Sequence, residues 1–245
     1  MRRNIVIIAL YIFGMFIAVV PYILLDTFFN MEDPFEIVAF IVTYVSIALV
    51  LVYFIFIKLK DDFRPFINRF WKNVGIIGIV VVLSFTLSVV ANIITQLIGI
   101  TEEAVNQGGL IDMIKNATTG ELIVLVLLFC LLVPIIEELV FRKALYGLIK
   151  EFIIKIRLNG THDSDTEKIR KRLSISAVII SGLIFGLVHV SGDYIYLLHY
   201  GGAGIILTAS YYLSKENIYV PLTVHIIQNA IGVVQILIAI NLGLL

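Results

Sequence analysis

The stretch VPIIEELVFR, residues 133–142, places two adjacent glutamates and an arginine inside a run that is otherwise apolar. Ionisable side chains at membrane depth are costly, and those that occur there usually serve a function. Whether these three residues lie at such a depth depends on the composition of the rest of the chain.

The whole chain has the composition of a membrane protein. Of its 245 residues, 60% are hydrophobic and only 15% are charged, whereas soluble domains carry roughly 25% charged residues. A membrane-spanning helix needs about 20 predominantly apolar residues, and such runs recur along the sequence. They predict seven spans, at residues 4–25, 36–57, 74–100, 121–149, 173–190, 195–213 and 218–241. The expected fold is therefore an all-α, polytopic membrane bundle of about seven helices.

These spans are predicted to form one integral membrane domain, 1–245, with amino-terminal spans in 1–120 and the spans that carry polar motifs in 121–241. The first apolar run follows basic residues, as in a signal peptide, but it is long and no small-residue cleavage site follows, so a retained span is expected. Cys130 is the only cysteine, which excludes an internal disulfide or a cysteine-based zinc cluster.

Basic residues gather in two of the four long connectors. Segment 58–72 has five Lys or Arg residues and 150–172 has seven, whereas 101–120 has one and 26–36 has none. Basic loops stay on the cytoplasmic side, so the pattern predicts a cytoplasmic amino terminus and, with seven spans, an external carboxyl terminus. Such a basic rim is typical of membrane insertion rather than of a nucleic-acid site. The segment 157–172 is predicted to be a hydrophilic loop.

The three charged residues of the opening stretch divide into a pair and a single carboxylate. On a helix, Glu138 and Arg142 are four residues apart and share a face, where they can form an ion pair. Glu137 is turned by about 100° from its neighbour, and the residue four positions after it is Phe141, which cannot neutralise it. The pattern predicts one carboxylate held by an arginine and a second that faces another partner.

Two later spans contribute polar side chains at helical spacing. The motif FGLVH places His189 four residues after Phe185, and HIIQN places His225 and Asn229 on one face. A single histidine in a membrane helix is more often bonded to a neighbouring helix than catalytic. Together with Glu137, however, these side chains would each be unsatisfied in hydrocarbon unless they met. We therefore predict that they converge on one buried site.

A buried site of this composition suits the hydrolysis of an amide. Glu137 would take a proton from a water that His189 also holds, and His225 with Asn229 would donate hydrogen bonds to the oxyanion. Alternatively, Glu137, His189 and His225 would bind a zinc ion and leave one position open for water. The zinc-protease motif H-E-x-x-H is absent, and the residues alone leave both mechanisms open.

The motifs EELVFR, FGLVH and HIIQN, in this order, resemble the E-E-x-x-x-R, F-x-x-x-H and H-x-x-x-N motifs of the CPBP family of membrane proteins. That family comprises CAAX prenyl endopeptidases, bacteriocin-processing and immunity proteins, and abortive-infection (Abi) proteins. The resemblance covers roughly residues 121–232 and implies an all-helical intramembrane endopeptidase. The family is often drawn with eight spans, against the seven predicted here.

Carried onto this chain, the resemblance implies roles for Glu137, Glu138, Arg142, His189, His225 and Asn229. The first glutamate activates water, and the second forms a structural pair with the arginine. The first histidine shares the water, while the second histidine and the asparagine face the substrate carbonyl. Family members are described both as metalloproteases and as metal-independent glutamate proteases, so the zinc alternative stays open.

The expected partners are the lipid bilayer and a membrane-associated peptide or protein substrate, with no nucleic acid. Residues 150–172 carry no sign of prenyl recognition, which favours a short peptide, pheromone or bacteriocin leader over a prenylated protein, in a bacterial plasma membrane. A non-catalytic bacteriocin immunity or scaffold protein is an alternative from another class. A proton-coupled transporter ranks last, because the sequence shows neither an inverted repeat nor paired broken spans.

Other features predict architecture rather than chemistry. The stretch HYGGAGI, 199–205, offers small residues that let membrane helices approach closely. His199, at its start, is interpreted as a packing or interfacial residue. Trp71, near the start of a span, suits anchoring at the membrane interface rather than ligand binding.

Overall fold

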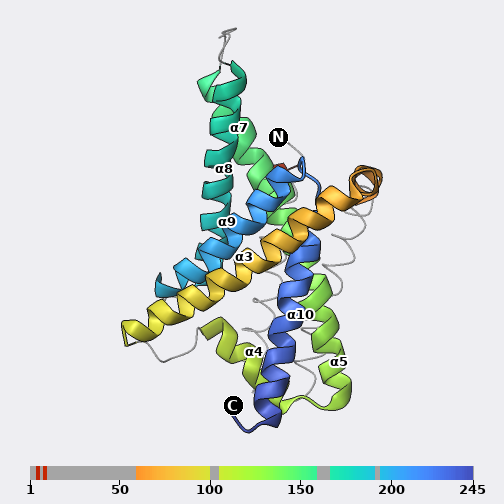
Figure 1. Ribbon diagram of the computed structural model, residues 1–245, viewed down its shortest axis with the longest axis vertical. Coiled ribbons are helices and arrows are strands. Elements are labelled where there is room, and N and C mark those ends of the chain that lie inside the picture. The colour runs from red at the N-terminus through yellow and green to blue at the C-terminus, as the bar shows by residue number, and fades with distance from the viewer. Residues whose placement is uncertain are drawn as a thin grey trace, which may run out of the picture.

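The computed structural model describes residues 4–5, 8–9, 59–99, 105–158, 166–190 and 194–244, and no strand occurs among them. Its α-helices are α3 (Phe70–Leu97), α4 (Val105–Asn116), α5 (Thr119–Leu127), α6 (Val133–Glu137), α7 (Gly147–Arg157), α8 (Thr166–His189), α9 (Leu197–Leu213) and α10 (Tyr219–Asn241). Two π-helical segments, η1 (Leu128–Leu132) and η2 (Glu138–Tyr146), join α5, α6 and α7 into one continuous run, and a short 3-10 helix, η3 (Tyr194–Tyr196), precedes α9. The prediction of an all-α membrane bundle is confirmed (Figure 1).

Four helices among the described residues are long and apolar enough to cross a membrane: Phe70–Leu97, Thr119–Arg157, Thr166–His189 and Tyr219–Asn241. They correspond to the predicted spans 74–100, 121–149, 173–190 and 218–241. The predicted span 195–213 is helix α9, which is shorter, with 17 residues. The first two predicted spans, 4–25 and 36–57, lie almost entirely outside the described residues.

Two predicted connectors contain helix. The connector 101–120 holds α4, whose Ile111 and Ile114 are buried in one apolar cluster with Cys130 and with residues of α10. The loop prediction for 157–172 is wrong over its second part, because α8 already begins at Thr166. Glu, Lys and Arg are good helix formers, so this charged stretch continues the apolar helix beyond its membrane part.

Helices α8 and α9 approach each other closely because glycines face each other between them. A Cβ atom added to Gly182 would lie 2.4 Å from the backbone nitrogen of Ile205, and one added to Gly186 would lie 2.5 Å from the Cα of Gly201. One added to Gly204 would lie 2.4 Å from the carbonyl oxygen of Gly182. Only residues without a side chain fit here, which confirms the close approach predicted from HYGGAGI.

The helical segment 59–67 is bonded to two later parts of the chain. The carboxylate of Asp62 pairs with Lys143 of η2 and accepts a hydrogen bond of 3.1 Å from the backbone nitrogen of Ile218, at the start of α10. The side-chain amide of Asn217 donates a second bond, of 2.7 Å, to the backbone carbonyl of Asp62. This segment therefore fastens the long helical run to α10.

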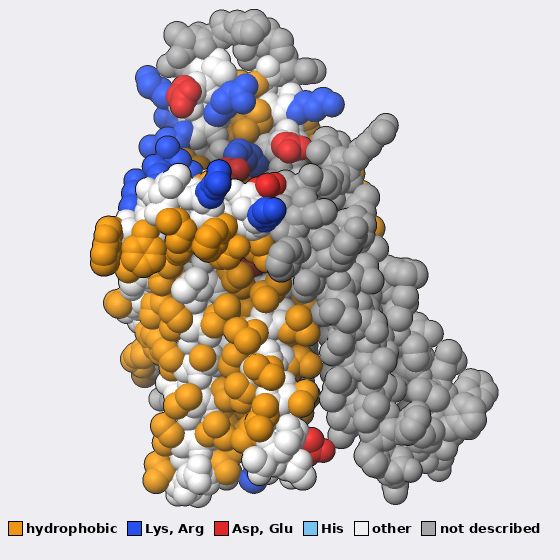
Figure 2. Space-filling model, turned by 90° about the vertical axis from the view of Figure 1, so that its right-hand side faces the viewer, with side chains coloured by type: hydrophobic (Ala, Val, Ile, Leu, Met, Phe, Trp, Pro, Cys, Tyr) orange, Lys and Arg blue, Asp and Glu red, His pale blue; other side chains and the backbone are white. Residues whose placement is uncertain are grey.

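Lys and Arg side chains gather at one end of the molecule, beside a broad apolar band (Figure 2). The end of α7 and the start of α8 reach this end in Figure 1, and they carry the exposed residues Lys155, Arg157 and Lys168. A charged end that borders an apolar band is typical of a protein at the boundary between membrane and water. Together with the four long apolar helices, it identifies an integral membrane protein.

Candidate functional site

The acidic stretch lies where the long helical run changes its winding. Glu137 ends α6, and Glu138 begins η2, the longer of the two π-helical segments. In a π-helix each N–H bonds to the carbonyl five residues earlier, and such segments are frequent at functional sites. The sequence prediction assumed a regular α-helix and did not foresee either π-helical segment.

The carboxylate of Glu137 faces two imidazole rings from two other helices. Its Oε1 lies 3.4 Å from Nε2 of His189, the last residue of α8, and its Oε2 lies 3.7 Å from Nε2 of His225 in α10. The side chains of Glu137, His189 and His225 are 13%, 16% and 9% exposed, respectively, so all three are largely, but not completely, buried. Three of the four side chains predicted to converge, those of Glu137, His189 and His225, thus lie together in the structure.

The second nitrogen of each ring is engaged elsewhere. Nδ1 of His189 lies 2.7 Å from the carbonyl oxygen of Phe185, and Nδ1 of His225 lies 2.8 Å from Oε1 of Glu138. A carbonyl or a carboxylate oxygen only accepts, so each Nδ1 carries the proton. A neutral ring therefore presents the lone pair of Nε2 to Glu137, and only a charged ring presents an N–H there.

Glu138 and Arg142 form the buried pair that their spacing predicts. Nε of Arg142 lies 3.1 Å from Oε2 of Glu138, and both side chains are 0% exposed. The guanidinium makes no well-aligned hydrogen bond to a described residue, but its Cζ lies 4.5 Å from the centre of the Phe185 ring. A cation above an aromatic face is stabilised by the ring's negative face. Arg142 is thus held by a carboxylate and a ring, and Glu138 in turn orients His225.

The amide of Asn229 is bonded to the backbone of η1. Its Nδ2 donates a hydrogen bond of 2.8 Å to the carbonyl oxygen of Phe129. In η1, the N–H of Val133 bonds to the carbonyl of Leu128, five residues earlier. The next carbonyl in this register belongs to Phe129, and its partner would be Pro134, which has no N–H. Asn229 therefore supplies the hydrogen bond that the proline withholds.

This bond adds a structural task to the oxyanion role predicted for Asn229. One of its N–H groups is committed to the backbone, which the sequence prediction did not include. Pro134 could have indicated such a bond from the sequence, because a proline inside an apolar helix leaves a backbone carbonyl that needs another donor.

Replacing Asn229 with leucine is expected to lower the free energy of unfolding by about 1–3 kcal/mol, because the carbonyl of Phe129 would lose its donor. Pro134→Ala places an N–H at the position from which that carbonyl can be reached, so the loss caused by Asn229→Leu should be smaller in that background. Denaturation of the purified protein in mild detergent, followed by circular dichroism, measures both losses. Equal losses in the two backgrounds would contradict the link between the proline and the amide.

The zinc alternative requires three ligands around one point. Zinc lies about 2.0–2.2 Å from its nitrogen and carboxylate ligands. Among the described residues, no group of three or more His, Cys, Asp or Glu side chains has the geometry to hold a metal ion.

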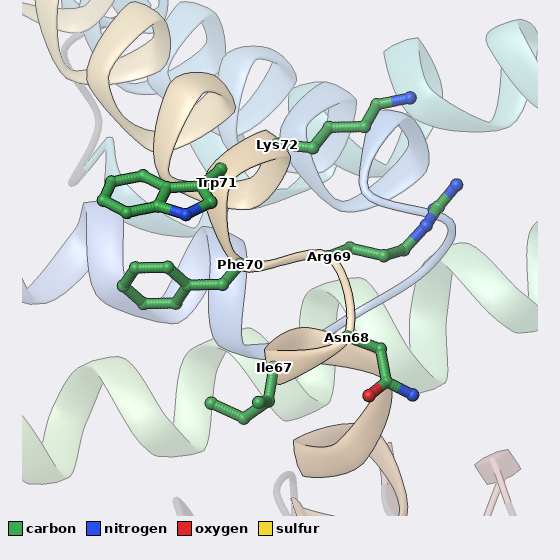
Figure 3. Close-up of a pocket in the computed structure, with 6 residues that line it drawn as sticks. All are labelled: Ile67, Asn68, Arg69, Phe70, Trp71 and Lys72. Atoms are coloured by element: carbon green, nitrogen blue, oxygen red, sulfur yellow. The ribbon is translucent and has the colours of Figure 1, made fainter.

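A surface hollow of about 480 Å³ lies apart from this cluster, at the turn before α3, and is lined by residues 67–72. Figure 3 shows the apolar side chains of Ile67, Phe70 and Trp71 on one side of the turn and the basic side chains on the other. Trp71 is 82% exposed. This arrangement agrees with interfacial anchoring, as predicted for Trp71, and places no acid or histidine in the hollow.

Residues 119–231 match the family described as Rce1-like, type II CAAX prenyl endopeptidases. The matched segment begins with α5, ends within α10 and includes the six residues predicted for the site. The family resemblance predicted from the three motifs is thereby confirmed over this segment.

Two curated bacterial proteins are similar to the chain. One is the membrane-embedded CAAX protease MroQ of Staphylococcus aureus (strain USA300), 27% identical over 160 residues, which are 65% of this chain and 56% of MroQ. The other is the putative membrane peptidase YdiL of Bacillus subtilis (strain 168), 26% identical over 151 residues, which are 62% of this chain and 51% of YdiL. The chain thus spans about half the length of these relatives. No solved structure matches it.

Proposed function

We propose that this membrane protein, with its likeness to Rce1-like endopeptidases, hydrolyses a peptide bond within the membrane by means of a water activated by Glu137 and His189. The observation that carries the proposal is the carboxylate of Glu137 facing Nε2 of His189 at 3.4 Å and Nε2 of His225 at 3.7 Å, on three separate helices. A base and potential donors meet here in a place largely shielded from solvent, which is what amide hydrolysis requires.

In this reaction Glu137 is the general base. A water between its Oε1 and Nε2 of His189 gives a proton to the carboxylate as the water oxygen bonds to the substrate's carbonyl carbon. The electron pair of the C=O double bond moves to oxygen and forms an oxyanion. The proton then passes from Glu137 to the amide nitrogen as the C–N bond breaks. A carboxylic acid and an amine leave, and Glu137 regains its charge.

The charges of the cluster support His225 as the donor to the oxyanion. Glu137, Glu138 and Arg142 together carry one net negative charge, and a charged His225 would balance it from its place between the two carboxylates. Because Nδ1 of His225 donates to Glu138, the charged ring has its second N–H, on Nε2, directed toward the reaction centre. A buried donor of this kind stabilises a developing oxyanion strongly.

The substrate class proposed is a membrane-associated peptide or protein, either CAAX-type or a pheromone or bacteriocin leader. The similar proteins are bacterial and are named as a CAAX protease and a membrane peptidase. We place the Lys- and Arg-rich end on the cytoplasmic side of a bacterial plasma membrane, with the amino terminus on that side, because basic segments are retained there.

A comparison of membrane peptides tests the proposal directly. Cells that produce the wild-type protein, the Glu137→Gln variant or the Glu151→Gln variant are grown in parallel, and their membrane-associated peptides are compared by mass spectrometry. We expect shortened peptides that are present with the wild type and with Glu151→Gln but missing with Glu137→Gln, since residue 151 is an exposed position on α7. The same peptides in all three samples would rule out the peptidase and favour the immunity or scaffold alternative.

A further inference from the structure

The imidazole of His189 stacks on two aromatic rings. The ring of Phe185, one turn earlier on α8, is centred 4.1 Å away at an interplanar angle of 29°. The ring of Tyr200, on α9, is centred 5.7 Å away at 27°. Tyr200 in turn meets the ring of His199 edge-on, at 5.1 Å and 86°. One of the contacts that hold His189 therefore comes from a different helix.

Tyr200 reaches His189 because the backbones of α8 and α9 come together at this point. Gly186 lies three residues before His189, and Gly201 directly follows Tyr200. A Cβ atom on Gly186 would lie only 2.5 Å from the Cα of Gly201, so the two glycines permit an approach that any larger residue would prevent. The glycine contact thus sets the position of the phenol ring relative to the imidazole.

The orientation of this imidazole matters because its two nitrogens face different partners. Nδ1 lies 2.7 Å from the carbonyl oxygen of Phe185, and Nε2 lies 3.4 Å from Oε1 of Glu137. Rotation of the ring about its bond to Cβ would remove both contacts. The interactions with Phe185 are local to α8, whereas the face of Tyr200 restrains the ring from outside that helix.

We propose that Tyr200 is a positioning residue, which holds the ring of His189 so that Nε2 faces Glu137. Its effect on cleavage rests on the function proposed above, but its effect on the ring does not. The aromatic face of Tyr200 performs this task, so Tyr200→Phe should preserve it and Tyr200→Leu should abolish it. Tyr212→Leu, a change at a tyrosine farther along α9, is the matched control.

Nuclear magnetic resonance of ¹⁵N-histidine-labelled, full-length protein in lipid nanodiscs tests the position of the ring. The chain has 4 histidines, and the signals of His189 are assigned by their loss in His189→Gln. We expect the form of His189 with its proton on Nδ1 to dominate in the wild type, in Tyr200→Phe and in Tyr212→Leu. In Tyr200→Leu we expect a mixture of this form and the form with its proton on Nε2. If leucine prevents folding, Tyr200→Met takes its place as the variant without a ring.

Cleavage of a peptide found by the comparison above gives the second readout. Because a small misplacement of a catalytic group can cost up to about 100-fold in rate, we expect kcat to fall roughly tenfold in Tyr200→Leu, with KM nearly unchanged and with Tyr200→Phe close to the wild type. If the Nδ1-protonated form of His189 still dominates in Tyr200→Leu, the proposal is overturned, whether or not the protein is a peptidase. Equal losses of kcat in the Phe and Leu variants would overturn it too, because the ring would not be the part that matters.

Discussion

Replacing Glu137 with glutamine is expected to lower the rate of peptide cleavage by about 10²–10⁴-fold, the range attributed to a general base. Glutamine has nearly the size of glutamate and keeps an oxygen in the site, but its amide cannot take a proton from water. The variant also removes a charge that is only 13% exposed, and buried charges are costly. We therefore expect the melting temperature to stay the same or rise while cleavage is lost.

The measurement is the initial rate of cleavage by purified protein in nanodiscs, with the melting temperature of each sample determined in parallel. Glu151→Gln removes a carboxylate from an exposed position of the same helical run and should cleave at the wild-type rate. Wild-type cleavage by Glu137→Gln would refute the assignment of the base. Loss of cleavage together with a large fall in melting temperature would also count against it, because the loss would then reflect misfolding.

Breaking the buried pair is expected to have the largest effect on stability. Arg142→Leu removes a guanidinium that is 0% exposed and leaves Oε2 of the equally buried Glu138 without its arginine partner. Removing one partner of a buried ion pair costs about 3–5 kcal/mol. We expect a loss of this size in the free energy of unfolding, measured by denaturation in detergent, and a loss of cleavage as well.

The double variant Glu138→Leu with Arg142→Leu separates the effect of the buried pair on protein stability from the effect of Glu138 on the orientation of the His225 ring. Replacing both members of a buried pair with apolar residues is often nearly neutral, so most of the stability should return. Cleavage should not return, because the N–H at Nδ1 of His225 would have lost the carboxylate that accepts its hydrogen bond. A double variant as active as the wild type would mean that Glu138 does not orient His225.

The spacing of charged and polar residues was sufficient to predict the pair and the cluster. The pairing of Glu138 with Arg142 follows from helical periodicity, and π-helical winding did not disturb it. The meeting of Glu137 with two histidines follows from the cost of leaving each polar group alone in hydrocarbon. Both arguments need only the residue types and the helix repeat, which are properties of the sequence.

Depth in the membrane was harder to predict. Counting along each helix from the nearest basic connector, at Lys150, Arg172 and Lys215, places Glu137, His189 and His225 at roughly 20, 25 and 15 Å, at a rise of about 1.5 Å per residue. The three nevertheless meet, although α7 and the start of α8 extend beyond the turn between α9 and α10 in Figure 1. A count along one helix therefore does not show where its residues meet those of another helix.

The contacts of Asn229 and Tyr200 were beyond a prediction from one sequence. Asn229 bonds to the carbonyl of Phe129 because the π-helical winding of η1 pairs that carbonyl with Pro134, which has no N–H. Tyr200 stacks on His189 only because glycines set the crossing of α8 and α9. Each depends on how two helices are placed relative to one another, which the periodicity of a single helix does not contain.

The bonds of Asp62 set a lower limit on the smallest fragment that can retain the site. The segment that matches the family begins only at residue 119, yet Lys143, one residue after Arg142, and the first turn of α10 are both anchored to Asp62. A fragment cut to the matched segment would keep every motif and lose the anchor, leaving a cation and a helix start without their carboxylate. The segment that matches the family is therefore smaller than the set of helices that these bonds hold together.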